Sequence, residues 1–155
     1  MDNSKSTRFS IELDEIDTAI IEKLRLDGRA AFSQMAQELN VSPGMIRIRY
    51  NRLVENGCLK VVAISNPVQM GFETMGMIGI KVEGNKLLDA ANKIAEFDEV
   101  VYLVITSGSY DILAEVRALD QTDFLKFLTE KLYQIEGVKE SESFLHLKIM
   151  KEIYF

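Results

Sequence analysis

Residues 31–57, AFSQMAQELNVSPGMIRIRYNRLVENG, contain two short helical patterns separated by a tight break. The apolar positions of the first pattern are Met35, Ala36 and Leu39, and Ser33 is its expected N-cap. In the second pattern, Ser42 is a good N-cap and Pro43 fits the first helical position, where no N–H is needed. Gly57 marks its end. Two helices joined by so short a turn cross steeply, which predicts a helix-turn-helix.

The second of these helices has two faces. Its expected buried stripe is Ile46, Tyr50 and Leu53. The residues that we expect to face DNA are Ser42, Gly44, Arg47, Ile48, Arg49, Asn51 and Arg52. Arginine and asparagine reach guanine and adenine edges, so Arg47 and Asn51 are the predicted base readers.

Phosphate contacts are expected from the helix N-terminus at Ser42 and from Arg49 or Arg52. In an alternative role, Arg49 holds the domain together by pairing with an acid such as Asp17 or Asp27.

The charge distribution supports DNA binding by this segment. Residues 42–60 hold four basic side chains against one acid, although the whole chain carries a net charge of −6. Residues 1–66 are neutral overall, with nine basic and nine acidic side chains, while residues 67–155 hold nine and fifteen. The second part is therefore not expected to touch DNA. The alternative for the basic helix is a solvated amphipathic helix whose arginines make surface ion pairs.

The remaining composition excludes several classes of protein. No long apolar run could span a membrane and no signal peptide precedes the helices, so we expect a cytoplasmic protein that does not bind membranes. Cys58 and His146 each occur alone, which argues against a disulfide, a metal site or a catalytic triad. We expect Cys58 to be half-buried, and we expect no enzyme activity, catalytic residue, metal or cofactor.

The order of patterns along the chain predicts two domains in an α+β protein. The expected parts are a flexible N-terminus at 1–12, a three-helix helix-turn-helix domain at 13–60, a connecting strand and linker at 61–74, and a second domain at 75–155. Asp14 is the expected N-cap of the first helix. The connecting segment either pairs with another short strand or only leads away from the DNA-binding unit.

The second domain reads strand, helix, strand, strand, helix, strand. Its expected strands are 75–82, 100–106, 112–116 and 138–149. This βαββαβ order predicts a ferredoxin-like fold with both helices on one face of the sheet.

The strands carry more apolar surface than two helices can cover, at Met75, Met77, Ile78, Ile80, Tyr102 and Val104. We therefore expect the uncovered face to bury against a second copy of the chain, which would pair two helix-turn-helix units. The alternative is a monomer with a larger core.

From Leu13 to about Tyr154, the chain resembles the Lrp/AsnC family of bacterial and archaeal transcription regulators. The resemblance rests on LDEID at 13–17, Asp27-Gly28-Arg29, the S-P-x-x-I-x-x-R-x-x-R-L run at 42–53, Glu55-Asn56-Gly57 and Gly108-Ser109-Tyr110-Asp111. The chain departs from the family at Val61-Val62, where a Gly-Tyr pair is usual.

The resemblance implies a regulator that binds double-stranded DNA, commonly upstream of its own gene. It also implies a second domain that forms dimers or octamers and holds a small effector, commonly an amino acid. The effector residues implied by the glycine and Tyr-Asp element are Ser107, Gly108, Ser109, Tyr110 and Asp111. A glycine turn offers N–H groups to a carboxylate, and Asp111 could accept an α-ammonium. The alternative is that Gly108 and Asp111 simply make the turn and Tyr110 packs.

Two other functions fit the same layout. A nonspecific architectural protein would bend or wrap DNA, but it would normally display a broader basic surface than one helix. Haem-pathway decarboxylases resemble this two-domain arrangement, but a single histidine and an acidic second domain suit a multiply carboxylated tetrapyrrole poorly.

Overall fold

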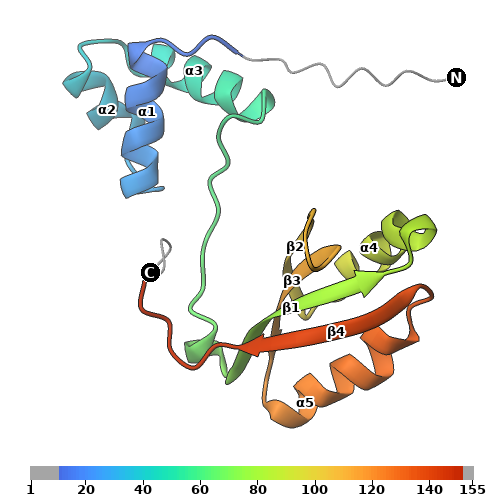
Figure 1. Ribbon diagram of the computed structural model, residues 1–155. Helices are drawn as coiled ribbons and strands as arrows, with labels where there is room; N and C mark the ends of the chain where they lie inside the picture. The colour runs from blue at the N-terminus through green and yellow to red at the C-terminus, as the bar shows by residue number, and fades with distance from the viewer. Residues whose placement is uncertain (1–10, 152–155) are drawn as a thin grey trace, which may run out of the picture. The chain divides into compact units, whose positions relative to one another are not determined.

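A computed structural model describes residues 11–151 of the 155-residue chain (Figure 1). The chain divides into two compact units, residues 1–63 and 64–155, at a point within the predicted connector. The predicted flexible N-terminus, 1–12, lies almost wholly outside the described residues. Among the described residues, no helix is both long and apolar enough to cross a membrane.

The first unit is the predicted three-helix domain. Its helices are α1 (Glu15–Leu26), α2 (Phe32–Glu38) and α3 (Pro43–Glu55). They enclose a core of Ile20, Leu24, Met35, Ala36, Ile46 and Leu53. The predicted stripe of α3 is confirmed, because Ile46 and Leu53 are fully buried and Tyr50 packs against this core.

The ends of α3 are fixed by the residues that the sequence indicated. The Ser42 hydroxyl accepts the N–H of Met45 at 3.2 Å, and Pro43 occupies the first turn. The helix ends at Glu55 with Asn56 as its C-cap, and Gly57 follows with a φ of 69°, a left-handed conformation that glycine adopts without strain.

The start of α2 differs from the prediction. Its N-cap is Ala31, which makes no side-chain cap, and Ser33 lies inside the first turn. Phe32 packs against Tyr50 of α3 with ring centroids 5.1 Å apart. Packing between helices stabilises this helix start. The prediction that Ser33 is the N-cap was therefore wrong.

Four acidic and basic side chains join α1 to α3. Asp14 and Asp17 form a capping box: the Asp14 carboxylate accepts the Asp17 N–H at 2.9 Å, and the Asp17 carboxylate accepts the Asp14 N–H at 3.2 Å. Asp17 is fully buried and accepts hydrogen bonds from Arg49, at 3.0 Å, and from Arg52. Arg49 also reaches Asp14 at 2.6 Å. We call these four residues the α1–α3 ion cluster.

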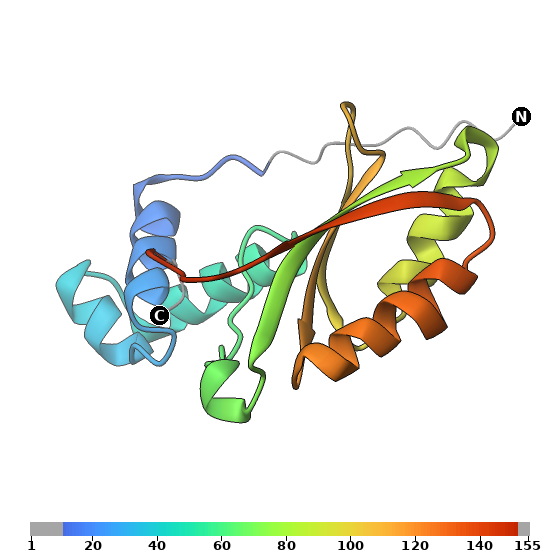
Figure 2. The same cartoon turned by 60° about the horizontal axis from the view of Figure 1, so that its bottom comes forward.

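The second unit has the predicted βαββαβ order. Its elements are β1 (Thr74–Val82), α4 (Leu87–Ala95), β2 (Val100–Ile105), β3 (Ile112–Ala118), α5 (Gln121–Lys126) and β4 (Val138–Leu145). The strands form one antiparallel sheet in the order β2-β3-β1-β4. Figure 2 shows α4 and α5 on the same side of this sheet, so the ferredoxin-like α+β fold is confirmed.

The core of this unit lies between the sheet and its helices. Residues alternate along β3, where Ile112, Ala114 and Val116 are fully buried. Ile78 and Ile80 of β1 also belong to this core. They therefore lie on the face that the helices cover, and Met75 and Met77 lie on the other face, because alternate residues of a strand point to opposite faces.

Two segments differ from the predicted strands. Residues 59–66 form no strand in the described chain, since no neighbouring strand is present to pair with them, and the connector alternative holds. A short 3-10 turn, Val68–Met70, follows. The last strand ends at Leu145, before the predicted 149, although the His146 N–H still reaches the Met75 carbonyl at 2.8 Å.

Replacing Asp17 by alanine is expected to lower the free energy of unfolding of the first unit by about 3 kcal/mol. This is the low end for breaking a buried ion pair, because Arg49 and Arg52 keep contact with water. Urea unfolding of the full chain, followed by circular dichroism, measures the change. Glu22→Ala removes an exposed acid from the same helix and serves as the control. Equal unfolding midpoints for the two variants would contradict the prediction.

Candidate DNA-binding and effector sites

The exposed face of α3 carries the predicted base readers. Arg47 and Asn51 are exposed and lie one helical turn apart, with Ile48 beside them at 71% exposure. Within residues 11–151, Arg47 has no carboxylate partner. This face can therefore offer a guanidinium, an amide and an apolar side chain to base edges.

Arg49 and Arg52 lie closer to α1. Both donate to the buried carboxylate of Asp17, so the alternative role of Arg49 is present in the structure, with Asp14 as a further partner and Asp27 not involved. Their phosphate contacts stay predictions. Of the two, Arg52 is more available, with 43% of its side chain exposed against 23% for Arg49.

The ion cluster shifts the pKa of two of its members, Asp14 and Arg49. Hydrogen bonds from the Asp17 backbone N–H and then from Arg49 hold the pKa of the Asp14 carboxyl below its ordinary value. Hydrogen bonds to Asp14 and Asp17 raise the pKa of Arg49 in turn. Both shifts favour the charged forms that hold α3 against α1.

The N-terminus of α3 borders a shallow hollow on the surface of the first unit. The hollow is lined by Phe32, Ser33, Pro43, Gly44 and Arg47. A Cβ added at Gly44 would meet the Ser42 hydroxyl at an ordinary 3.8 Å, so the fold itself does not require glycine there. Ser42 and Gly44, the predicted contacts at this helix end, are both exposed.

The turn between β2 and β3 is anchored to β1 through Asp111. Its carboxylate accepts the Val82 N–H at 2.8 Å, and its own N–H donates to the Ile80 carbonyl at 2.9 Å. The Asp111 carbonyl accepts the Thr106 N–H at 2.9 Å. Asp111 thus shapes the turn, which agrees with the alternative in which its role is structural.

Tyr110 lies on the face of the sheet opposite the helices. Its ring covers Gly79 of β1 so closely that an added Cβ would come within 2.7 Å of it. The ring also meets Phe144 edge to face, with centroids 6.3 Å apart. The requirement for Gly79 was missed in the sequence, although a glycine inside a strand commonly marks a close approach of this kind.

The outer part of the turn leaves its backbone available. Ser107, Gly108 and Ser109 are exposed, and a Cβ on Gly108 would meet nothing within 4 Å. Within the part of the chain that the structure describes, no N–H of residues 107–110 donates a hydrogen bond. Successive free N–H groups of this kind can receive a carboxylate. The roles of residues 107–111 in effector binding stay predictions.

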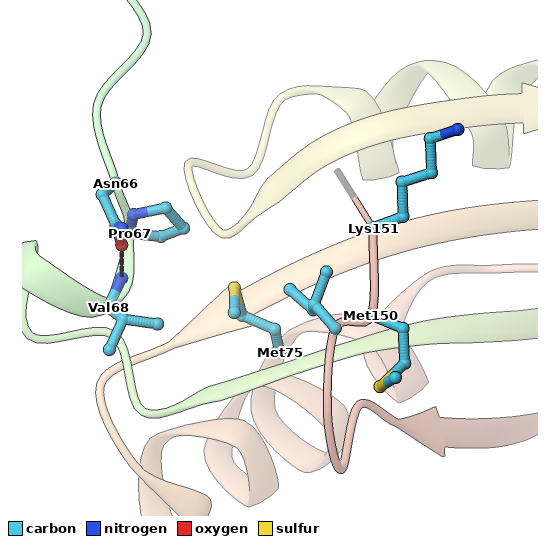
Figure 3. A pocket seen from close by; sticks show the side chains of 7 residues that line it. Asn66, Pro67, Val68, Met75, Met150 and Lys151 are labelled. Carbon is cyan, nitrogen blue, oxygen red and sulfur yellow. Dashed lines mark hydrogen bonds between the residues drawn. The ribbon is translucent and has the colours of Figure 1, made fainter. Parts of the chain in front are cut away.

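A further open pocket lies where the connector enters the second unit (Figure 3). The Asn66 side chain accepts the Val68 N–H there at 3.0 Å, which begins the 3-10 turn. The lining residues are Asn66, Pro67, Val68, Met75, Ile149, Met150 and Lys151. Since Lys151 alone among them is charged, this pocket lacks the opposite charges that an amino acid would need.

Residues 11–151 hold no group of three histidine, cysteine or acidic side chains placed to bind a metal ion. Cys58 is exposed, so the expected half-buried position was wrong. The reason is local: its N–H bonds to the Leu53 carbonyl at 2.8 Å in the turn that ends α3, and this leaves the side chain outside the core.

Comparisons with known sequences agree with this arrangement. An AsnC-type helix-turn-helix domain matches residues 13–54, and a Lrp/AsnC ligand binding domain matches residues 75–154. The chain is 35% identical over 142 residues to an uncharacterised HTH-type transcriptional regulator of Pyrococcus horikoshii, covering 91% of this chain and 90% of that protein. It is 34% identical over 141 residues to the HTH-type transcriptional regulator Ptr1 of Methanocaldococcus jannaschii, covering 90% and 95%.

Solved structures share the fold. The structure of E. coli AsnC is similar with a TM-score of 0.84 and 26% identity, covering 93% of this chain and 99% of that one. A transcriptional regulator of Neisseria meningitidis, crystallised as an L-Met complex, is similar with a TM-score of 0.81 and 23% identity, covering 91% and 94%.

Proposed function

This chain belongs to the Lrp/AsnC family of transcriptional regulators, and we propose that it is a sequence-specific regulator whose paired second domains sense a free amino acid. The family joins a helix-turn-helix to a ligand-binding domain, as this chain does. Sequence-specific reading is supported by the environment of Arg47. Its guanidinium makes no ion pair with a carboxylate of the described residues, whereas Arg49 and Arg52 are paired.

In this proposal the arginines of α3 have two different roles. Arg49 and Arg52 fix the angle of α3 against α1 through the α1–α3 ion cluster. Arg47 and Asn51 then present hydrogen-bonding groups in the major groove, and Ile48 lies beside them for apolar contact. Because the partners of Arg49 and Arg52 are internal carboxylates, holding α3 in place does not require a contact with DNA.

Replacing Arg47 by alanine is expected to weaken binding to the preferred DNA by about 1 to 3 kcal/mol and to relax base preference at the position that it reads. Arg25→Ala removes the same charge from the exposed end of α1 and should preserve that preference. Fluorescence anisotropy on DNA upstream of the protein's own gene, against a random duplex of equal length, measures both effects at low and near-physiological salt.

Two outcomes would count against this proposal. An equal loss on all sequences from Arg47→Ala would place Arg47 on the phosphate backbone instead of on base edges. Equal binding of both duplexes that disappears at the higher salt would favour the architectural alternative.

The open face of the sheet supports pairing of two chains. On the face opposite the helices, Leu113 of β3 lies between Val104 of β2 and Gly79 of β1, and Met77 lies two residues before Gly79 on the same face. On β4, Phe144 lies opposite Met77 and remains 46% exposed. An apolar sheet face is seldom left in water, so we propose that it packs against the same face of a second copy.

Phe144→Glu is expected to convert the wild-type oligomer to monomers at micromolar concentration, because each copy would place a carboxylate in the apolar interface. Leu88→Glu is the matched control, since Leu88 is 68% exposed on α4, on the helical side. Sedimentation equilibrium measures the mass of each variant. A dimeric Phe144→Glu protein, or a monomeric wild type, would refute pairing through this face.

Effector binding is proposed at the turn 107–111. The match to a Lrp/AsnC ligand binding domain and the L-Met complex of the Neisseria regulator both support an amino acid as ligand. The free N–H groups of residues 107–110 suit its carboxylate, and the Asp111 oxygen that does not bind Val82 suits its ammonium.

Gly108→Val is expected to weaken amino-acid binding at this turn at least about tenfold, because a branched side chain would cover the exposed N–H groups. Gly84→Val is the control, since both glycines have open space at Cβ and neither has a positive φ. Isothermal titration with the twenty amino acids identifies the ligand and measures the loss. Equal affinities for the two variants would remove residues 107–111 from the effector site.

A further inference from the structure

Ile48 is an unusually exposed apolar side chain for a short helix. It is 71% exposed, whereas Met45 and Val54 of the same helix are 41% and 40% exposed. Ile48 is not among the described residues that pack against the core of the first unit. A β-branched residue is also a poorer helix former than alanine. Neither packing nor helix formation therefore accounts for an isoleucine at this position.

The geometry of α3 directs Ile48 away from the core. At about 100° per residue, Ile48 lies about 160° around the helix axis from Ile46 and about 140° from Leu53. These two are the fully buried residues of α3. By the same geometry, Asn51 lies about 60° from Ile48, on the outward face. A recognition helix that enters the major groove turns this face towards the base edges.

Gly44 leaves the apolar surface of Ile48 open. It precedes Ile48 by four residues, and helical side chains lean towards the helix N-terminus, so Ile48 extends over the turn that contains Gly44. A Cβ added at Gly44 would meet the Ser42 hydroxyl at 3.8 Å, and no closer atom. Because residue 44 has no side chain, a flat surface such as the edge of a base can approach Ile48 from this side.

The neighbours of Ile48 indicate the chemistry of its partner. A single exposed apolar side chain is ordinary on a protein surface. This one adjoins Arg47 and Asn51, in a segment, 42–60, with four basic side chains against one acid. An apolar protein partner that covered Ile48 would also remove these polar groups from water, which is costly. On the major-groove edges of unmodified DNA bases, the apolar group is the 5-methyl group of thymine.

We propose that Ile48 reads the 5-methyl group of a thymine in the preferred DNA. This inference rests on the proposed function of the first unit as a sequence-specific reader of DNA, and it names a further base that the unit recognises. Arg47 and Asn51 supply hydrogen bonds to base edges, while Ile48 adds a preference for a T·A pair beside them through apolar contact. Specificity at that position comes from a methyl group and not from a charge.

Uracil provides a sharp test, because it pairs with adenine as thymine does and lacks only the methyl group. The preferred duplex is selected from a random library with the full chain, and each of its thymines is then replaced in turn by uracil. Fluorescence anisotropy at near-physiological salt measures the affinity of each duplex. We expect uracil to weaken binding of the wild type about fourfold at one thymine position, which is the loss expected for one buried methyl-sized group.

Two substitutions of Ile48 assign this effect to its side chain. Ile48→Ala should bind the thymine duplex about fourfold more weakly than the wild type and should bind the uracil duplex no more weakly than the thymine duplex. Ile48→Val keeps a branched apolar side chain and should keep most of the uracil effect. Since Ile48 is exposed, urea unfolding should give all three proteins similar midpoints.

Val54→Ala is the matched control. It shortens another exposed β-branched side chain of α3, but at the C-terminal end of the helix, whereas recognition helices contact base edges through their N-terminal residues. This variant should show the full uracil effect. A loss of the uracil effect in Val54→Ala as large as in Ile48→Ala would contradict the assignment to Ile48.

The remaining outcomes separate this inference from the proposed function. If uracil has no effect at any thymine, or the same effect in Ile48→Ala as in the wild type, the inference is overturned, while specific binding that depends on Arg47 leaves the proposed function standing. If no preferred duplex can be selected, both fail together. The same series is carried out with 5-methylcytosine at each cytosine, the other source of this methyl group. Tighter binding there, with no effect of uracil, would overturn the assignment to thymine.

Discussion

The buried carboxylate of Asp17 is the interaction on which the DNA-binding unit depends. A fully buried acid is costly unless it is paired, and here each oxygen accepts a hydrogen bond from an arginine of α3. The same carboxylate closes the capping box of α1 through the Asp14 N–H. One residue therefore sets both the start of α1 and the crossing angle of α3, which an apolar core alone would leave less sharply defined.

This constraint also limits the free charge of the helix that is proposed to bind DNA. Two of the arginines of α3 are neutralised internally, and the face proposed to read bases retains Arg47 with Asn51 and Ile48. A protein that bound DNA chiefly through phosphates would keep more of its cations available. The arrangement therefore favours reading of base edges over general electrostatic attraction, in a chain whose net charge is −6.

The sequence predicted those features that neighbouring residues determine. The caps of α3 follow from Ser42, Pro43 and Gly57, and the ferredoxin-like order follows from local periodicity. Features that depend on distant contacts were missed or left open. Ser33 does not cap α2 because Phe32 packs against Tyr50, and the segment expected to form a strand at the connector has no partner strand among the described residues.

The candidate sites divide in the same way. Arg47 and Asn51 could be assigned from their spacing on one helix, and the turn 107–111 from its glycine and the family resemblance. The partners of Asp111 and the close approach of Tyr110 to Gly79 arise only when separate strands meet.

The strand β3 connects several of these distant contacts. Its first residue, Ile112, follows the turn 107–111, and the guanidinium of its penultimate residue, Arg117, lies over the Phe72 ring. Between them, alternate side chains fill the core beneath α4 and α5, while Leu113 faces the open side of the sheet. A close-packed strand cannot shift at one end without repacking its neighbours. A change at the turn 107–111 would therefore act on the same packed element that carries part of the proposed pairing face.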